Sequence, residues 1–143
     1  MTVSTDAARP LPMPASETIW QCSRTFPAIA EQVGHARAFL VEALAGCPMA
    51  DDAVVVGSEL SANAIMHSDS RERGGQFVVR AEVHEGDYLW IEVEDQGGDW
   101  VEHESTDEHG RGLLVVAAFS SEWGIEGDSL ARVVWARFDW PGR

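Results

Sequence analysis

Lysine is absent from this chain of 143 residues, because all ten of its basic residues are arginine. The chain therefore lacks both the amine that forms a Schiff base and the lysine of a GxxxxGK phosphate loop, which excludes a P-loop mechanism. Cysteine is also scarce: Cys22 and Cys47 stand far apart and form no CxxC spacing. We expect two partly buried core thiols and assign them no function.

Long apolar segments are missing as well. No run approaches the roughly 18 residues that a membrane span needs, and no basic segment leads into a hydrophobic one at the amino terminus. Basic charge is sparse, since 24 acidic residues against ten basic ones give a formal charge of −14. This charge repels the phosphates of nucleic acids and anionic lipids. We expect a cytoplasmic protein that binds neither nucleic acid nor membranes.

The length and the 45% of hydrophobic residues suit one globular domain with a real core. Pro10, Pro12 and Pro14 alternate with other residues near the amino terminus, which favours extended backbone and forbids a helix there. The sequence therefore predicts a flexible leader at 1–16 and a single domain at 17–143.

The first part of the domain has the pattern of a strand followed by two helices. Mixed polar and apolar residues at 20–26 suit an edge strand, which Pro27 closes. A near-helical spacing over 33–44, with glycine and proline after it, predicts a helix. The acidic pair at 51–52 opens a second helix at its dipole-positive end. The expected face of the first helix consists of Val33, Arg37, Leu40, Val41 and Leu44.

The second part of the domain has the pattern of two hairpins separated by a loop and a helix. Apolar residues alternate over 77–83 and 89–93, which indicates a hairpin. Residues 96–112 have no periodicity and predict a long loop of the kind that acts as a lid. A short buried helix at 113–119 follows, and two strands around the turn at 127–128 end the chain. The predicted fold class is α+β, with a mixed, mostly antiparallel sheet and helices on one face.

Two features together predict a nucleotide site. Glu59 and Asn63 stand at i and i+4 of the second helix. Such positions lie about 5 to 6 Å apart on one face, so the pair can present a proton acceptor and a metal ligand side by side. Residues 109–113 (His-Gly-Arg-Gly-Leu) suit a glycine turn that opens a helix, with left-handed backbone and bare N–H groups for a phosphate. A solvated helix face and an ordinary loop-to-helix connection are the alternatives.

Three ordered motifs carry a resemblance to a known family. Residues 58–68 (SELSANAIMHS) resemble the N box of the GHKL ATPases, 94–98 (EDQGG) their first glycine box, and 109–113 (HGRGL) their second. The spacing and the small size make the chain similar in particular to the stand-alone anti-sigma-factor serine kinases and their actinobacterial relatives. The resemblance spans roughly residues 20 to 140 and implies a Bergerat-type ATP-binding fold, which is a two-layer α/β sandwich.

The resemblance assigns roles to single residues and implies ATP and Mg²⁺ as cofactors. Asn63 would coordinate Mg²⁺ through its amide oxygen, and Glu59 would accept the proton of an attacking hydroxyl as the catalytic base. Asp95 would accept a hydrogen bond from the exocyclic amine of adenine. This bond favours ATP over GTP, because guanine has a carbonyl oxygen at that position. An ordinary turn after a strand is the alternative for Asp95. The other implied ATP-binding residues are Gly97, Gly98, Gly110, Arg111, Gly112 and Leu113.

The resemblance also implies protein partners. The domain would bind a sigma factor, an anti-sigma antagonist protein or both, and would phosphorylate a serine of the antagonist; a homodimer stays open. A non-catalytic interaction module with weak or no ATP binding is one alternative, and a detached histidine-kinase catalytic domain is another. Two positions depart from the family pattern. Asp99 stands at the last position of the first glycine box, and the last strand carries Arg132-Val133-Val134 where relatives commonly place a threonine.

Overall fold

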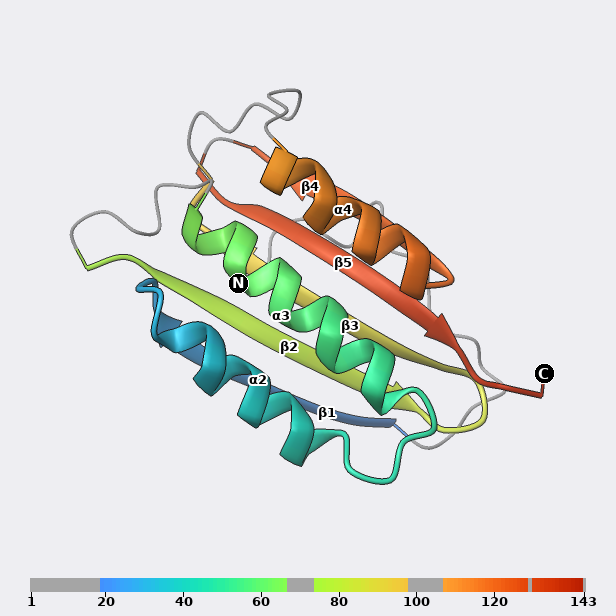
Figure 1. The fold of residues 1–143 in the computed structure, drawn as a ribbon. Coiled ribbons are helices and arrows are strands. Elements are labelled where there is room, and N and C mark those ends of the chain that lie inside the picture. The colour runs from blue at the N-terminus through green and yellow to red at the C-terminus, as the bar shows by residue number, and fades with distance from the viewer. Residues whose placement is uncertain (1–18, 67–73, 98–106, 129, 143) are drawn as a thin grey trace.

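The protein is a two-layer sandwich in which helices cover one face of a five-stranded sheet (Figure 1). The computed structural model describes residues 19–66, 74–97, 107–128 and 130–142. The elements are β1 (Ile19–Pro27), α2 (Gln32–Ala43), α3 (Ala50–Met66), β2 (Gln76–His84), β3 (Tyr88–Asp95), α4 (Asp107–Phe119), β4 (Glu122–Gly127) and β5 (Arg132–Asp139). The predicted α+β sandwich is confirmed, and the predicted leader at 1–16 lies outside the described residues.

The sheet has the strand order β1-β2-β3-β5-β4. The sequence predicts a mixed, mostly antiparallel sheet, and all four pairings among the described strands are antiparallel. β1 is an edge strand, as predicted. Side chains alternate between the two faces of a strand, so Phe77, Val79 and Ala81 of β2 all join the core beneath the helices. Gly86, with a φ of 84°, forms the turn between β2 and β3.

Two stacked indole rings join β3 to β5 on the face opposite the helices. The rings of Trp90 and Trp135 are nearly parallel, at 12°, with their centroids 4.6 Å apart. Nε1 of Trp90 donates a hydrogen bond of 2.9 Å to Glu92, so the ring is also held at its polar edge. Such cross-strand pairs stabilise a particular register. That register places Asp95 of β3 directly opposite Arg132 of β5.

The helix α3 lies between α2 and α4 in the helical layer (Figure 1). Gly57 of α3 faces Leu40 of α2, and a Cβ atom at Gly57 would overlap the Leu40 side chain. Glycine therefore lets the two helices approach closely. The predicted face of α2 is partly wrong: Ala36 and Leu40 are buried, but Val41 is 52% exposed.

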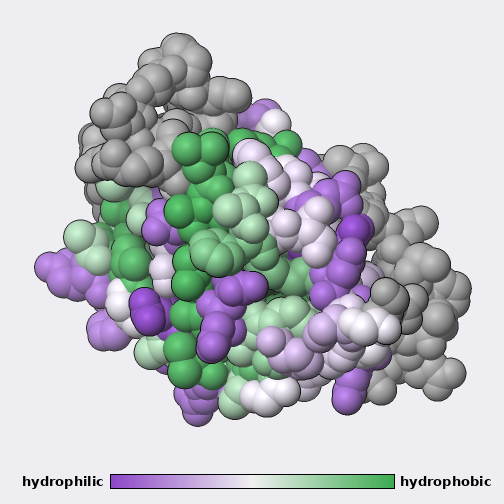
Figure 2. All heavy atoms as spheres, turned by 45° about the vertical axis from the view of Figure 1, so that its right-hand side comes forward, coloured by the Kyte–Doolittle hydropathy of each residue, from purple (hydrophilic) through white to green (hydrophobic). Residues whose placement is uncertain are grey.

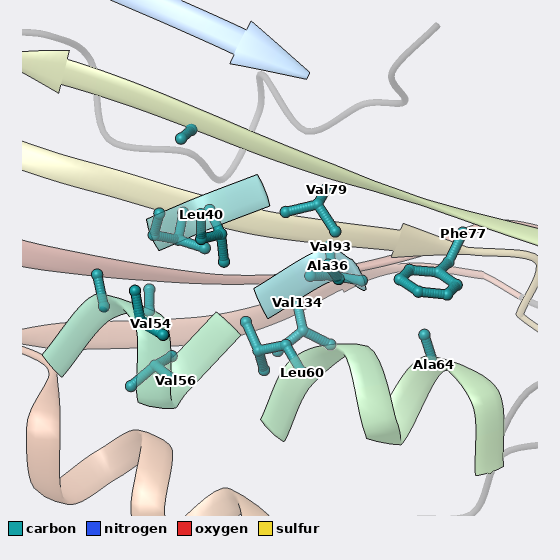
Figure 3. Close-up of a cluster of buried hydrophobic side chains, with 14 of the residues drawn as sticks. Ala36, Leu40, Val54, Val56, Leu60, Ala64, Phe77, Val79, Val93 and Val134 are labelled. Carbon is teal, nitrogen blue, oxygen red and sulfur yellow. The ribbon is translucent and has the colours of Figure 1, made fainter. Parts of the chain in front are cut away.

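The main core fills the space between the helical layer and the sheet. Figure 3 shows side chains of α3, including Leu60 and Ala64, directed toward side chains of the sheet such as Phe77 and Val93. Each of these four is at most 1% exposed. Phe26 of β1 stacks on Phe77 with ring centroids 5.5 Å apart. The core thus ties α3 firmly to the strands that carry the rest of the candidate site.

The two cysteines are free thiols packed at the margin of this core. Both are half-buried, as predicted, and burial raises the pKa of the Cys22 thiol and of the Cys47 thiol. A raised pKa keeps a thiol protonated and poorly nucleophilic.

The helix α4 begins earlier than the sequence predicts. The predicted loop at 96–112 and short helix at 113–119 are wrong in their boundary, because α4 begins at Asp107. Gly110 and Gly112 lie within this helix and have helical backbone. The glycines suggested a turn, since glycine weakens a helix interior, but the structure accommodates both inside α4.

Over residues 112–119 of α4 the exposed side chains are apolar, which corrects the prediction of a buried helix at 113–119. Leu114 is 68% exposed and Phe119 is 43% exposed. Within residues 112–119 only Gly112 and Val116 are buried. Figure 2 shows a band of apolar residues crossing the face in view, beside polar patches. Among the helices that the structure describes, none is long and apolar enough to cross a membrane.

Candidate functional site

Three elements that carry predicted site residues, α3, β3 and α4, lie with β5 at one end of the sandwich, at the upper left of Figure 1. α3 and β3 both end there, whereas β5 and α4 both begin there. The core fixes α3 on the sheet, so this meeting point is part of the fold rather than a separate appendage. Residues distant in sequence can therefore contribute to one site.

Gly112 brings α4 against the polar pair of α3. A Cβ atom at Gly112 would lie 3.3 Å from Oε1 of Glu59 and 3.8 Å from Oδ1 of Asn63. The structure thus places residues of the first and third motifs in contact range. The predicted reason for the glycine is wrong: Gly110 and Gly112 do not form a left-handed turn, because their backbone is helical. Gly112 instead allows the close approach of two helices.

The donor set of Glu59 and Asn63 fits a hard divalent cation. Asn63 is only 8% exposed, and Glu59 is half-buried. Their carboxylate and amide oxygens face the space that a Cβ atom at Gly112 would occupy. Oxygen ligands of this kind suit Mg²⁺, which usually takes one or two protein ligands and completes its shell with water and phosphate. Asn63 is the residue that would hold the ion, with Glu59 beside it.

Asp95 ends β3 on the helix-covered face, and its carboxylate is already hydrogen-bonded. The backbone N–H of Gly97 donates to Oδ1 at 2.7 Å. Arg132 donates to Oδ2 from Nη2 at 2.7 Å and from Nε at 3.2 Å. Gly97 has a φ of 72°, a left-handed value that glycine adopts without strain. The donors that Asp95 needs are therefore supplied in part by the protein itself.

Burial dominates the electrostatics of this carboxyl group. Removal from water raises the pKa of Asp95, while the charge of Arg132 and the hydrogen bonds from Gly97 and Arg132 lower it in part. Asp95 is 4% exposed and Arg132 is 5% exposed. Both charges are thus nearly dry, and each depends on the other for its compensation.

Arg132 is the residue of this site that sequence reasoning missed. A signal for it exists: an arginine opens the strand RVVWARFD, in which most residues are buried. A buried arginine needs an acidic partner, and Asp95 is the carboxylate that closes the adjacent strand. The pairing itself requires the register of β3 against β5, which no local pattern supplies.

The structure describes the other predicted residues only in part. Leu113 is half-buried on α4, directly after Gly112. Gly98 lies outside the described residues, and the described side chains do not include that of Arg111. The roles assigned to Gly98 and Arg111 therefore stay predictions.

Comparison with known proteins agrees with this architecture. The family model described as the histidine kinase-like ATPase domain matches residues 26–138, which is most of the chain. A search of curated protein sequences finds no match.

Two solved structures are similar in fold. The crystal structure of the RsbU and RsbW domains of Rv1364c from Mycobacterium tuberculosis superposes with a TM-score of 0.67 at 23% identity, covering 86% of this chain and 34% of that one. The present chain thus spans about a third of that protein's chain. The SiaB-SiaC complex from Pseudomonas aeruginosa gives a TM-score of 0.57 at 15% identity, covering 82% and 88%. Together with the family match over residues 26–138, the motifs and the sandwich show that the chain belongs to the family of histidine kinase-like ATPase domains.

Proposed function

We propose that this domain binds Mg²⁺-ATP and phosphorylates a serine of a regulatory protein partner, in the manner of the anti-sigma-factor serine kinases that its motifs resemble. The observation that carries the proposal is the close approach of Gly112 to Glu59 and Asn63, which places a candidate base and a candidate metal ligand side by side against the middle of α4. Family membership implies ATP binding, and the described residues of the three motifs lie toward one end of the fold.

Each residue has a chemical task in this proposal. Bound Mg²⁺ would neutralise charge on the phosphates, and Asn63 would hold it there through Oδ1. Glu59 would take the proton of the serine hydroxyl. The serine oxygen would bond to the γ-phosphorus while the bond from that phosphorus to the oxygen of ADP breaks. Asp95 and Gly97 would lie beside the adenine, because both are buried, one at the end of β3 and the other two residues beyond it.

The proposed partner is a sigma factor, an anti-sigma antagonist protein or both. The apolar surface of α4, with Leu114 and Phe119 exposed, is suited to contact with another protein. One of the two similar structures is itself a complex of two proteins, SiaB and SiaC. The same exposed surface favours the second candidate function, an interaction module that does not transfer phosphate.

Calorimetric titration with ATP, with and without Mg²⁺, tests nucleotide binding. We expect saturable binding that strengthens when Mg²⁺ is present. Absence of ATP binding at millimolar nucleotide would reject the proposal and leave the interaction module.

Incubation with γ-labelled ATP and candidate antagonist proteins then tests phosphotransfer. The expected label is a phosphoserine on the partner, which survives acid treatment. An acid-labile phosphohistidine would instead indicate a detached histidine-kinase catalytic domain. Saturable ATP binding without any labelled partner, across all candidates that bind the domain, would favour the interaction module.

A further inference from the structure

The ion pair of Asp95 and Arg132 is buried and is held by two hydrogen bonds, unlike an ordinary surface contact between strands. Nη2 and Nε of Arg132 both donate to the same oxygen, Oδ2, at 2.7 and 3.2 Å. The side chains are 6% and 2% exposed for Arg132 and Asp95, respectively. Surface salt bridges contribute little because water screens them, whereas this pair is sheltered from water.

The pair occupies the face of the sheet on which the candidate site lies. Strand alternation puts Asp95 on the same face as Val93, and Arg132 on the same face as Val134. Val93 and Val134 both belong to the core beneath the helices. The guanidinium group therefore points to the helix-covered side, at the end where α3 stops and α4 begins.

Hydrogen-bond capacity at Asp95 is limited. A carboxylate offers about four acceptor positions. The backbone N–H of Gly97 uses one on Oδ1, and Arg132 uses two on Oδ2. About one position on Oδ1 is thus left, so an exocyclic amine must bind Oδ1 beside the Gly97 N–H or displace the guanidinium group from Oδ2.

We propose that Arg132 sets the base preference of the nucleotide site, because it holds the Asp95 oxygen that an exocyclic base amine would otherwise bind. This inference rests on the proposed nucleotide-binding function. Binding of adenine through Asp95 then competes with the ion pair, so the exocyclic amine adds little to the affinity of the native protein for ATP. Arg132 acts through Asp95 and is a positioning residue.

The test compares ATP with purine riboside triphosphate, which has the same phosphates and sugar but lacks the amine. Dissociation constants are measured by calorimetry at one fixed Mg²⁺ concentration, for the native protein and for Arg132→Gln. In Arg132→Gln, the preference for ATP should increase by about tenfold or more, the effect of one hydrogen bond to a charged group. The double variant Asp95→Ala/Arg132→Gln should lose this gain, because the carboxylate is gone.

Arg137→Gln provides the matched control. Arg137 lies on the same strand and also forms ion pairs, with Glu122 at 2.9 Å and Asp139 at 3.0 Å. Its register partner on β3 is Trp90, well away from Asp95. The control should show the native preference. An unchanged preference in folded Arg132→Gln would overturn the inference while leaving nucleotide binding intact.

A second measurement uses the native protein, in case Arg132→Gln does not fold. The Nε–H resonance of Arg132 is followed by nitrogen-15 NMR and assigned from its loss in Arg132→Lys. Saturating ATP should shift this resonance, and purine riboside triphosphate should shift it much less. An identical response to both bound nucleotides would overturn the inference. If neither nucleotide binds any variant, the proposed function fails and this inference fails with it.

Discussion

Glu59 of α3 and Gly112 of α4 approach so closely that one added methyl group at Gly112 would lie 3.3 Å from the Glu59 carboxylate. A Cβ atom rarely comes this near another heavy atom, so the carboxylate would have to move by a few tenths of an ångström. The crossing of the two helices and the position of the candidate base are therefore set by the same contact. This relationship makes the effects of substitutions at the two positions predictable.

Gly112→Ala should lower phosphotransfer by about tenfold or more, because small displacements of a catalytic group are costly. Its effect on the free energy of unfolding should stay within about 1 kcal/mol, since alanine favours a helix over glycine by roughly that amount and offsets the crowding. Phosphotransfer assays and urea unfolding measure the two quantities. Native activity in this variant would show that the Glu59 carboxylate tolerates the shift.

Gly34→Ala is the control for Gly112→Ala. Gly34 also lies inside a helix, α2, and a Cβ atom there would have no heavy atom within 4 Å. The variant should gain about 0.5 to 1 kcal/mol of stability through helix propensity, with unchanged phosphotransfer. A loss of activity here would mean that helix stiffness, rather than contact with Glu59, explains the Gly112 result.

Glu59→Gln should retain nucleotide binding but lower phosphotransfer by about 10²-fold or more, because a base acts in the transition state rather than in the bound ground state. Glutamine keeps the shape that packs against Gly112, so the helix crossing should persist. Calorimetry and the γ-label assay are run on the same preparation. Equal transfer rates in the variant and the native protein would remove Glu59 from the role of base.

Asn63→Ala should abolish the Mg²⁺ dependence of ATP binding while the circular dichroism spectrum stays native. The amide oxygen is the proposed ligand, and alanine supplies no oxygen in its place. Titrations with and without Mg²⁺ should therefore coincide in the variant. The metal role is wrong if native binding itself shows no response to Mg²⁺.

The sequence predicts most of the fold because the periodicities are strong and local. The alternation of Phe77, Val79 and Ala81 identifies β2 without reference to any other segment. The boundary of α4 fails for the opposite reason. Gly110 and Gly112 weaken a helix by local propensity, and only the neighbouring α3 shows why a glycine at 112 is needed.

The candidate site also has a part that local sequence predicts and a part that depends on distant segments. Glu59 and Asn63 are neighbours by helix geometry, so their pairing is predictable from spacing alone. Arg132 and Asp95 meet only through the register of two strands that are distant in the chain. That register depends on contacts such as the stacked rings of Trp90 and Trp135, which involve both strands at once.

The pH dependence of stability should reveal which force dominates at Asp95. Burial raises the pKa of its carboxyl group above the ordinary value of 3.8, although Arg132 opposes the shift. Above that ordinary value the unfolded chain releases the Asp95 proton first, so it binds fewer protons than the folded protein does. The contribution of Asp95 is thus fully present below 3.8 and is lost as pH rises through the raised pKa.

Comparison with Asp95→Asn isolates this contribution, because asparagine does not titrate. Free energies of unfolding are measured by urea for both proteins between about pH 3 and 7, the range in which a carboxyl group of raised pKa titrates. The stability of the native protein minus that of Asp95→Asn should fall as pH rises, by about 1.4 kcal/mol for each unit of pKa shift. A difference that grows with pH would mean that the attraction of Arg132 outweighs burial and lowers the pKa. In Arg132→Gln the opposing charge is absent, so the pKa of Asp95 should rise further and the decline should extend to higher pH.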